Sequence, residues 1–250
     1  MFYRLNLTNY NLNQQEKRNS KDSVFGDKCE ALSTYDFWET AKVFSSADAK
    51  RMKDVEYCCS IFILANEGIV DQTNGKKIND YYDDYRDDFD KDGALEKKIL
   101  KAMDIIEDII DKTTIGFLSK KAQMYTLFCV IFQMFDKKKT FENFFEKVKI
   151  FVSVYSKFRN EFVINYDDPV MSSLYESIKK YKLASSEGIN KGTNRTIRFE
   201  ILYKLCNEES EEVFQALGKM TDDMRQRLDA KKDKKDELEM DDIIDKEEQS

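Results

Sequence analysis

Apolar residues recur every three or four positions through most of this chain, the spacing of one face of an α-helix. Segments 47–66 and 94–111 each carry one such stripe, whereas 120–135 is apolar on most sides, which predicts the most buried helix. Further helices are predicted at 14–19, 26–32, 35–44, 78–89, 141–160, 169–184 and 193–206. The pattern predicts an all-α fold, a multi-helix array of roughly eight to ten helices.

Polar residues, glycine and proline mark several of the expected helix ends. Asn13, Ser46 and Thr140 each precede a helical segment and can act as N-caps, because their side chains accept hydrogen bonds from the first-turn amides. Gly68 follows one segment, where a C-terminal cap is expected. Pro169 falls at a first-turn position, where its missing amide proton costs nothing.

The composition changes toward the C-terminus, so three parts are expected: helices over 1–115, a continuing bundle over 116–207, and 208–250. Residues 231–250 are mostly Lys, Asp and Glu, and are expected to form a frayed helix or a disordered tail. Before them an apolar stripe at helical spacing could dock on the body or on a partner helix; its residues are Val213, Leu217, Met220, Met224 and Leu228.

Composition excludes several kinds of chemistry. The chain has no histidine, so neither a Ser–His or Cys–His nucleophile pair nor a His-ligated zinc can form; no catalytic residue and no metal ligand is assigned. The five cysteines lack a framework spacing and are expected to be buried free thiols. A net charge of -7 argues against a dedicated nucleic-acid coat. The longest apolar run, 124–135, is too short to cross a bilayer, so no membrane association and a cytoplasmic location are expected.

The densest polar motif stands at the start, as Arg-Leu-Asn, a short loop, and then Leu-Asn-x-Gln-Glu-x-Arg-Asn. Its polar members are Arg4, Asn6, Asn13, Glu16, Arg18 and Asn19. This pattern resembles the N-terminal domain family of GmrSD-type restriction endonucleases. Arg51 and Asp54 fall in a segment similar to the next helix of that family, and the resemblance extends over about residues 2–115.

The resemblance implies a role in restriction or anti-phage defence. Members couple a ParB-like nucleotide-hydrolysing half, with an Asp-Gly-Gln-Gln-Arg motif, to DNA nicking or cleavage. That motif is not in this sequence and would lie upstream of Met1. The expected function is therefore a non-catalytic helical portion that packs on such a half. Nucleoside triphosphate and divalent metal would be bound mainly by that half; the expected partners are the half itself, a full-length relative, DNA through a partner, or a second copy.

Two interpretations of the opening motif remain open. Its carboxylate, guanidinium and amide groups could tie together a loop-to-helix corner. Alternatively Arg4, Glu16 and Arg18 could line one wall of a nucleotide or phosphate pocket, as the resemblance implies. Arg51 and Asp54, three apart on a helix, could form a plain ion pair, or Asp54 could orient Arg51 toward Glu16.

Two further clusters carry weaker hypotheses. Asp88, Asp90 and Asp92 match the first half of an EF-hand loop, but its twelfth position is Ile99, so a solvated acidic helix end is favoured. A hydrolase using Asp83 and Asp87 is the least favoured interpretation, because a charged helix face explains them.

The best candidates for contact with a DNA backbone are Arg195 and Arg198, three apart on one predicted helix. No recognition-helix pattern accompanies them. The alternative function for the whole chain is a stand-alone helical interaction protein, antitoxin-like or inhibitory, that uses the acidic surface and the 213–228 stripe.

Overall fold

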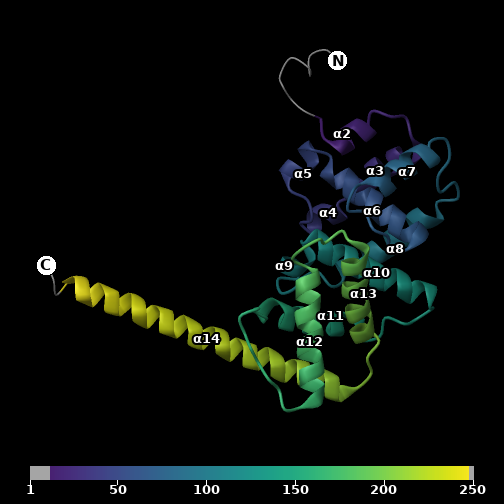
Figure 1. Cartoon of the computed structure of the whole chain (residues 1–250). Helices are drawn as coiled ribbons and strands as arrows, with labels where there is room; N and C mark the ends of the chain where they lie inside the picture. The colour runs from purple at the N-terminus through teal and green to yellow at the C-terminus, as the bar shows by residue number, and fades with distance from the viewer. Residues whose placement is uncertain (1–11, 248–250) are drawn as a thin grey trace.

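The computed structural model describes residues 12–247, with side chains up to residue 232. This part of the chain contains thirteen helices and no strand, which confirms the predicted all-α fold (Figure 1). In chain order they are α2 (Gln14–Arg18), α3 (Val24–Ser33), α4 (Phe37–Thr40), α5 (Ser46–Lys50), α6 (Lys53–Glu67), α7 (Lys76–Asp84), α8 (Ala94–Glu107), α9 (Ile115–Leu118), α10 (Lys121–Asp136), α11 (Phe144–Lys157), α12 (Pro169–Ala184), α13 (Gly192–Cys206) and α14 (Glu211–Glu247).

Helix α10 is the central element, as its apolar sequence predicts. Residues 123–132 are all buried, and the helix packs on α6 and α8 on one side and on α13 on the other. The N-terminal helices α2–α8 therefore meet the C-terminal bundle of α11–α14 across α10 (Figure 1). The five cysteines are buried and unpaired, as expected, and burial raises the pKa of the Cys58 thiol well above its ordinary value.

The predicted helix over 47–66 is two helices. Ser45, rather than Ser46, caps α5 in a reciprocal pair with Asp48, and the helix ends after one turn. Met52 then takes a left-handed conformation, with φ of 52°, and α6 begins at Lys53 in a new direction. A break of this kind leaves the apolar spacing almost intact, so periodicity alone missed it. Gly68 ends α6, as predicted.

Other boundaries also differ from expectation. Helix α4 covers only four residues of the predicted 35–44 segment, because Lys42 is left-handed and the chain turns back there. Thr140 caps nothing: α11 starts after Asn143, which is also left-handed. Helix α12 starts at Pro169 behind the Asp168 cap, as the sequence indicates. Residues 231–247, expected to be frayed or disordered, continue α14.

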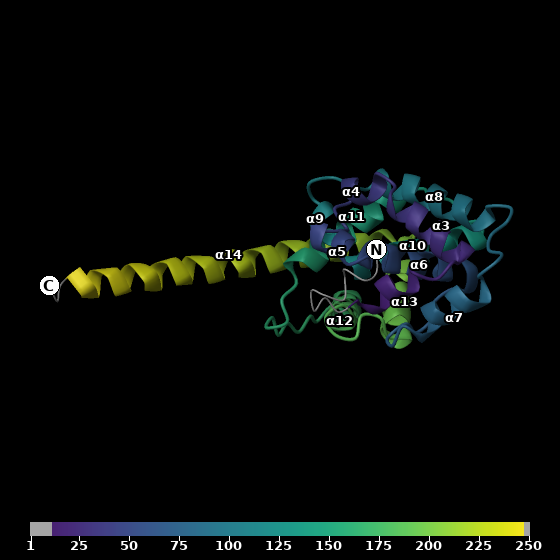
Figure 2. The ribbon, with the colours of Figure 1, turned by 90° about the horizontal axis from the view of Figure 1, so that it is seen from above.

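Helix α14 begins under the bundle and then projects away from it (Figures 1 and 2). Its first half packs on α11 and α12 through Leu217, Met220 and Met224, which are fully buried. The apolar stripe over 213–228 therefore docks on the body of the same chain. Lys231 pairs with Glu161 at 2.9 Å near the last point of contact.

Candidate functional site

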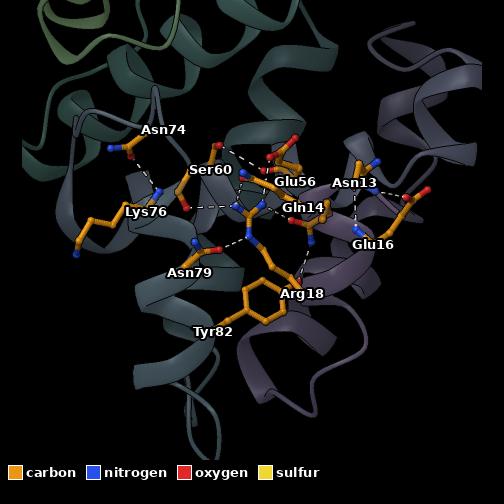
Figure 3. A network of polar contacts seen from close by, with 12 residues as sticks. Asn13, Gln14, Glu16, Arg18, Glu56, Ser60, Asn74, Lys76, Asn79 and Tyr82 are labelled. Carbon is orange, nitrogen blue, oxygen red and sulfur yellow. Dashed lines mark hydrogen bonds and ion pairs between the residues drawn. The ribbon is translucent and has the colours of Figure 1, made fainter. Parts of the chain in front are cut away.

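The opening motif forms a tightly bonded corner around Arg18, which is almost fully buried (Figure 3). Its Nε donates to Asn79 Oδ1 at 2.6 Å, and its Nη1 lies 3.2 Å from Glu56 Oε1. Nη2 donates to the Gly75 carbonyl at 3.2 Å. Glutamines 14 and 15 accept further hydrogen bonds from the same guanidinium. Arg18 thus joins α2, α6 and the start of α7, and its donors are occupied within the chain.

The other members of the motif divide between caps and ion pairs. Asn13 and Glu16 form a reciprocal capping box on α2, and Asn13 Nδ2 donates to the Arg51 carbonyl at 2.7 Å. Arg51 Nη1 lies 3.5 Å from Glu16 Oε1. Asn19 Nδ2 donates to Glu30, and Asp54 accepts from the Val55 amide.

Arg4 and Asn6 lie outside the described residues. The motif residues that the structure describes make caps, hydrogen bonds and ion pairs within the chain, as the interpretation of the motif as a loop-to-helix corner predicts.

The aspartates of the acidic run over 83–93 also serve as a helix cap and as ion-pair partners. Asp90 is left-handed, and its two carboxylate oxygens accept from the amides of Leu95 and Glu96 at the start of α8. Asp83 pairs with Lys21 at 2.8 Å. No group of three or more metal-ligating side chains is found in the described part of the chain.

A cavity of about 440 Å³ lies between the N-terminal helices and the pair α10 and α13. Its size falls in the range of small-molecule sites. It is lined from α2, α6, α7, α10, α13 and two loops by Gln14, Lys53, Glu56, Tyr57, Ser60, Gln72, Thr73, Asn74, Gly75, Ile78, Lys121, Ala122, Tyr125, Ile189, Asn190, Arg195 and Arg198.

Arg195 and Arg198 form the buried cationic wall of this cavity. Arg195 is 3% exposed and Arg198 is fully buried. Arg198 donates to Thr126 Oγ1 at 3.1 Å and to the carbonyls of Ala184 and Ile189 at 2.6 and 2.9 Å. Because both are buried, neither lies on an outer face of α13 where a duplex backbone could reach it, which differs from the DNA contact expected from the sequence.

Arg195 is likewise held by neutral groups. It donates to the Val70 carbonyl at 3.0 Å, to Tyr125 Oη at 3.3 Å and to Asn190 Oδ1 at 3.2 Å. Its guanidinium carbon lies 4.1 Å from the centre of the Tyr125 ring. Among the described residues, no carboxylate lies within 4 Å of either arginine. Neutral protein oxygens accept hydrogen bonds from both guanidiniums, but no negative charge balances them in the described part of the chain.

The electrostatics of the rest of the lining favour an anion. Glu56 is the one carboxylate among the lining residues that the structure describes, and Arg18 already pairs with it. Lys121 pairs with Asp48 at 2.7 Å, whereas exposed Lys53 has no ion-pair partner within the described part. Burial, together with the neighbouring charge of Arg195, lowers the pKa of Arg198. Helix α10 begins at the cavity without a side-chain cap, and this end adds positive potential.

Two loops close one side of the cavity and are tied to each other. Asp71 Oδ2 accepts from the Gly192 amide at 3.0 Å, and the Gln72 amide donates to the Asn190 carbonyl at 3.2 Å. Hydrogen bonds from the amides of Thr73 and Gly192 lower the pKa of Asp71 to about 2, and the charge of Arg195 contributes. The Asp71 carboxylate therefore holds the two loops together and does not form an ion pair with Arg195.

The side chain of Gln72, unlike the other buried polar side chains that the structure describes, makes no hydrogen bond within the described part of the chain. It is 6% exposed and lines the cavity, yet neither its Nε2 nor its Oε1 has a hydrogen-bond partner among the described residues. A buried amide left unpaired costs about 1–3 kcal/mol. Such groups are rare in folded proteins and mark places where a bound molecule can supply the partner.

The cavity combines surplus positive charge, two tyrosines and an unpaired amide, so it is suited to bind a polar anion. Sequence spacing indicated Arg195 and Arg198 as a pair, but not that their side faces inward. Lys53, Gln72 and Tyr125 carried no motif, because they come together only through tertiary packing.

Comparison of the chain with protein-family models, with curated proteins and with solved structures finds no match in any of the three. Between residues 12 and 247, no helix combines the length and the apolar character needed to span a bilayer.

Proposed function

We propose that this chain is a non-catalytic helical binding module that holds a phosphate-bearing ligand in the cavity between α6, α10 and α13. The observation that carries the proposal is the pair of buried guanidiniums, Arg195 and Arg198, with only neutral hydrogen-bond partners. Buried charges in proteins are normally paired, because desolvation of a lone ion is costly. An anion in the cavity would supply the missing charge.

The arrangement of cations favours phosphate over a carboxylate. Positive groups come from two helices, with Lys53 on α6 and the two arginines on α13, whereas Lys121 on α10 is already paired with Asp48. A phosphate carries close to two negative charges and three strong acceptor oxygens, so it can meet several donors at once. The planar fork of arginine suits phosphate oxygens well.

The test is the binding of inorganic triphosphate to the whole chain, measured by calorimetry and by the shift in melting temperature. We expect saturable binding that an equal ionic strength of sodium chloride does not reproduce. Lys53→Met should weaken affinity about tenfold, because it removes about 1.4 kcal/mol of charge-assisted contact. Its melting temperature without ligand should not change, since Lys53 is exposed and unpaired in the described part.

Lys50→Met is the matched control, because it removes the same charge from an exposed position on α5 that does not line the cavity. Equal affinity in wild type and Lys53→Met, or weakening by Lys50→Met of the same size, would mean that triphosphate binds elsewhere. No saturable binding at all would remove the proposal.

We further propose that the module belongs to a GmrSD-like restriction or anti-phage system and packs on a ParB-like nucleotide-hydrolysing half. The support is the opening motif and the helical character of this chain, as the resemblance implies. Co-expression with a ParB-like candidate and co-purification would test it. Nucleotide hydrolysis by the purified chain alone would contradict the non-catalytic role.

The stand-alone interaction protein gains no specific support. Its proposed docking stripe includes Leu217, Met220 and Met224, and these are already buried against α11 and α12.

A further inference from the structure

We propose that an apolar groove between α12, α13 and the start of α14 binds the alkyl chain of an uncharged molecule, such as a straight-chain alcohol. The groove has a volume of about 400 Å³, which falls in the range of small-molecule sites. It is separate from the cavity of the two arginines, since none of the described residues lines both. This site therefore stands or falls independently of phosphate binding.

The groove exists because α13 and α14 separate after a short connection. Helix α13 ends at Cys206 and α14 begins at Glu211, yet α14 packs mainly on α11 and α12 (Figure 1). Helix α12 packs on both α13 and α14, so it closes one side of the space between them. Ile201 of α13 and Val213 of α14 line this space.

Most of the residues that line the groove are apolar. Phe151 and Ile178 are almost fully buried, whereas Leu174, Ile201 and Val213 are only half-buried. Removal of apolar surface from water is favourable in proportion to its area. An apolar occupant would complete the burial of these side chains.

The charges at the mouth of the groove favour a ligand without a charge. Glu200, Lys204 and Glu208 line it at four-residue intervals, so charges of both signs lie along one edge. The Glu208 carboxylate accepts hydrogen bonds from the amides of the two residues that follow it. A cationic head group would meet Lys204, and an anionic one would meet the two glutamates. Neither sign of charge on the ligand is therefore preferred.

The interior of the groove has no polar group that needs a partner from a ligand. Ser177 Oγ donates to the Ser173 carbonyl at 2.9 Å within α12. Among the described residues, no buried side-chain polar atom of the groove lacks a hydrogen bond. An occupant thus gains apolar contact without having to supply hydrogen bonds.

The length of the groove suits an unbranched chain. The α12 positions that line it run from Pro169 to Ile178. At a helical rise of about 1.5 Å per residue, they span about 13 Å. An extended chain advances about 1.2 Å per bond, so about ten carbon atoms match this length. A compact ring would fill only part of the groove.

The experiment measures the binding of straight-chain alcohols from hexanol to dodecanol to the full chain by ligand-observed NMR. We expect each added methylene to tighten binding about fourfold up to about decanol, and further methylenes to add nothing. Decanoate and decylamine, which carry the same chain with opposite charges, should each bind about fivefold more weakly than decanol, because each meets a like charge at the mouth.

Ser177→Leu tests the location, because it places a larger apolar side chain in the groove. The hydroxyl of Ser177 bonds only within its own helix, so this variant should melt at the same temperature as wild type or higher. Its affinity for decanol should fall tenfold or more. Ser156→Leu is the matched control, since Ser156 is exposed on α11, donates to the Ser153 carbonyl of its own helix and does not line the groove.

Three results would overturn the proposal. The first is the absence of alcohol binding or of any dependence on chain length in the wild-type chain, which needs no variant to fold. The second is unchanged affinity for decanol in Ser177→Leu, or an equal loss in Ser156→Leu. The third is tighter binding of decanoate or decylamine than of decanol, which would make the ligand a charged one.

Discussion

Two buried arginine sites in this molecule have opposite electrostatic character. Arg18 pairs with Glu56 at 3.2 Å and fills its other donors with side chains and a carbonyl of three helices. Arg195 and Arg198 are as deeply buried, but only neutral oxygens accept from them in the described part.

The difference separates an arginine that is neutralised within the fold, Arg18, from two whose positive charge remains unbalanced, Arg195 and Arg198. A guanidinium that has found its carboxylate gains little from a further anion, whereas one held by carbonyls and hydroxyls remains a net positive charge. One of the two interpretations of the opening motif placed Arg18 in the wall of a phosphate pocket, whereas the guanidiniums without a carboxylate partner in the described part lie on α13.

The largest expected effect is that of Arg18→Met. The change strands several buried acceptors, including the Gly75 carbonyl, and leaves Glu56 without its cation. We expect the free energy of unfolding to fall by about 3 kcal/mol. Urea denaturation measures this directly. Lys17→Met, next to it and exposed, should change stability by less than about 0.5 kcal/mol. A similar small loss for Arg18→Met would make that site as dispensable as the surface.

A smaller loss of unfolding free energy is expected for Gly75→Ala, which disturbs the contacts around Arg18 through the backbone. Gly75 has φ of +69°, and an added Cβ would lie 2.6 Å from Arg18 Nη2. We expect a destabilisation of about 2 kcal/mol from backbone strain and the displaced guanidinium.

Gly218→Ala in α14 has nothing within 4 Å of its added Cβ and should gain up to about 1 kcal/mol in the same urea titration. If both glycine changes shifted the midpoint in the same direction, the strain argument at Gly75 would not hold.

The smallest effect concerns Asp71, which ties the two loops beside Arg195. Its folded pKa of about 2 is below the ordinary 3.8, so its contribution is present above about pH 4 and is lost as pH falls toward 2. Asp71→Asn should therefore flatten the fall in the urea midpoint over this window. The change is small because the carboxylate is exposed. Asp87→Asn, another exposed aspartate, serves as control; an identical flattening there would assign the effect to net charge.

Local sequence signals predicted the helices well where apolar spacing and caps agreed. Helix α12 starts at Pro169 behind Asp168, and α10 spans Lys121–Asp136 against a predicted 120–135. The failures lie at Lys42, Met52 and Asn143, non-glycine residues in left-handed conformations; of the three, only asparagine is a residue type enriched there. Tertiary packing holds them there, and it is not encoded in a short window.

The cavity could not be predicted from local sequence signals, because it too depends on tertiary packing. Its walls come from five helices and two loops, and the orientation of α13 on α10 decides that Arg198 faces inward. Helical spacing placed Arg195 and Arg198 together correctly. It could not say which neighbour would cover them, nor that Gln72 would be left without a partner.

The hydrogen bond between Asp71 and Gly192 joins positions 121 residues apart. Asp71 is exposed, so water can compete for this hydrogen bond, and the seam between the two loops can open more easily than the buried contacts of α10. An occupant of the cavity would act as a non-covalent cross-link over the seam. Slower amide exchange on both sides at once, with unchanged exchange in α14, would be the mark of that thermodynamic coupling.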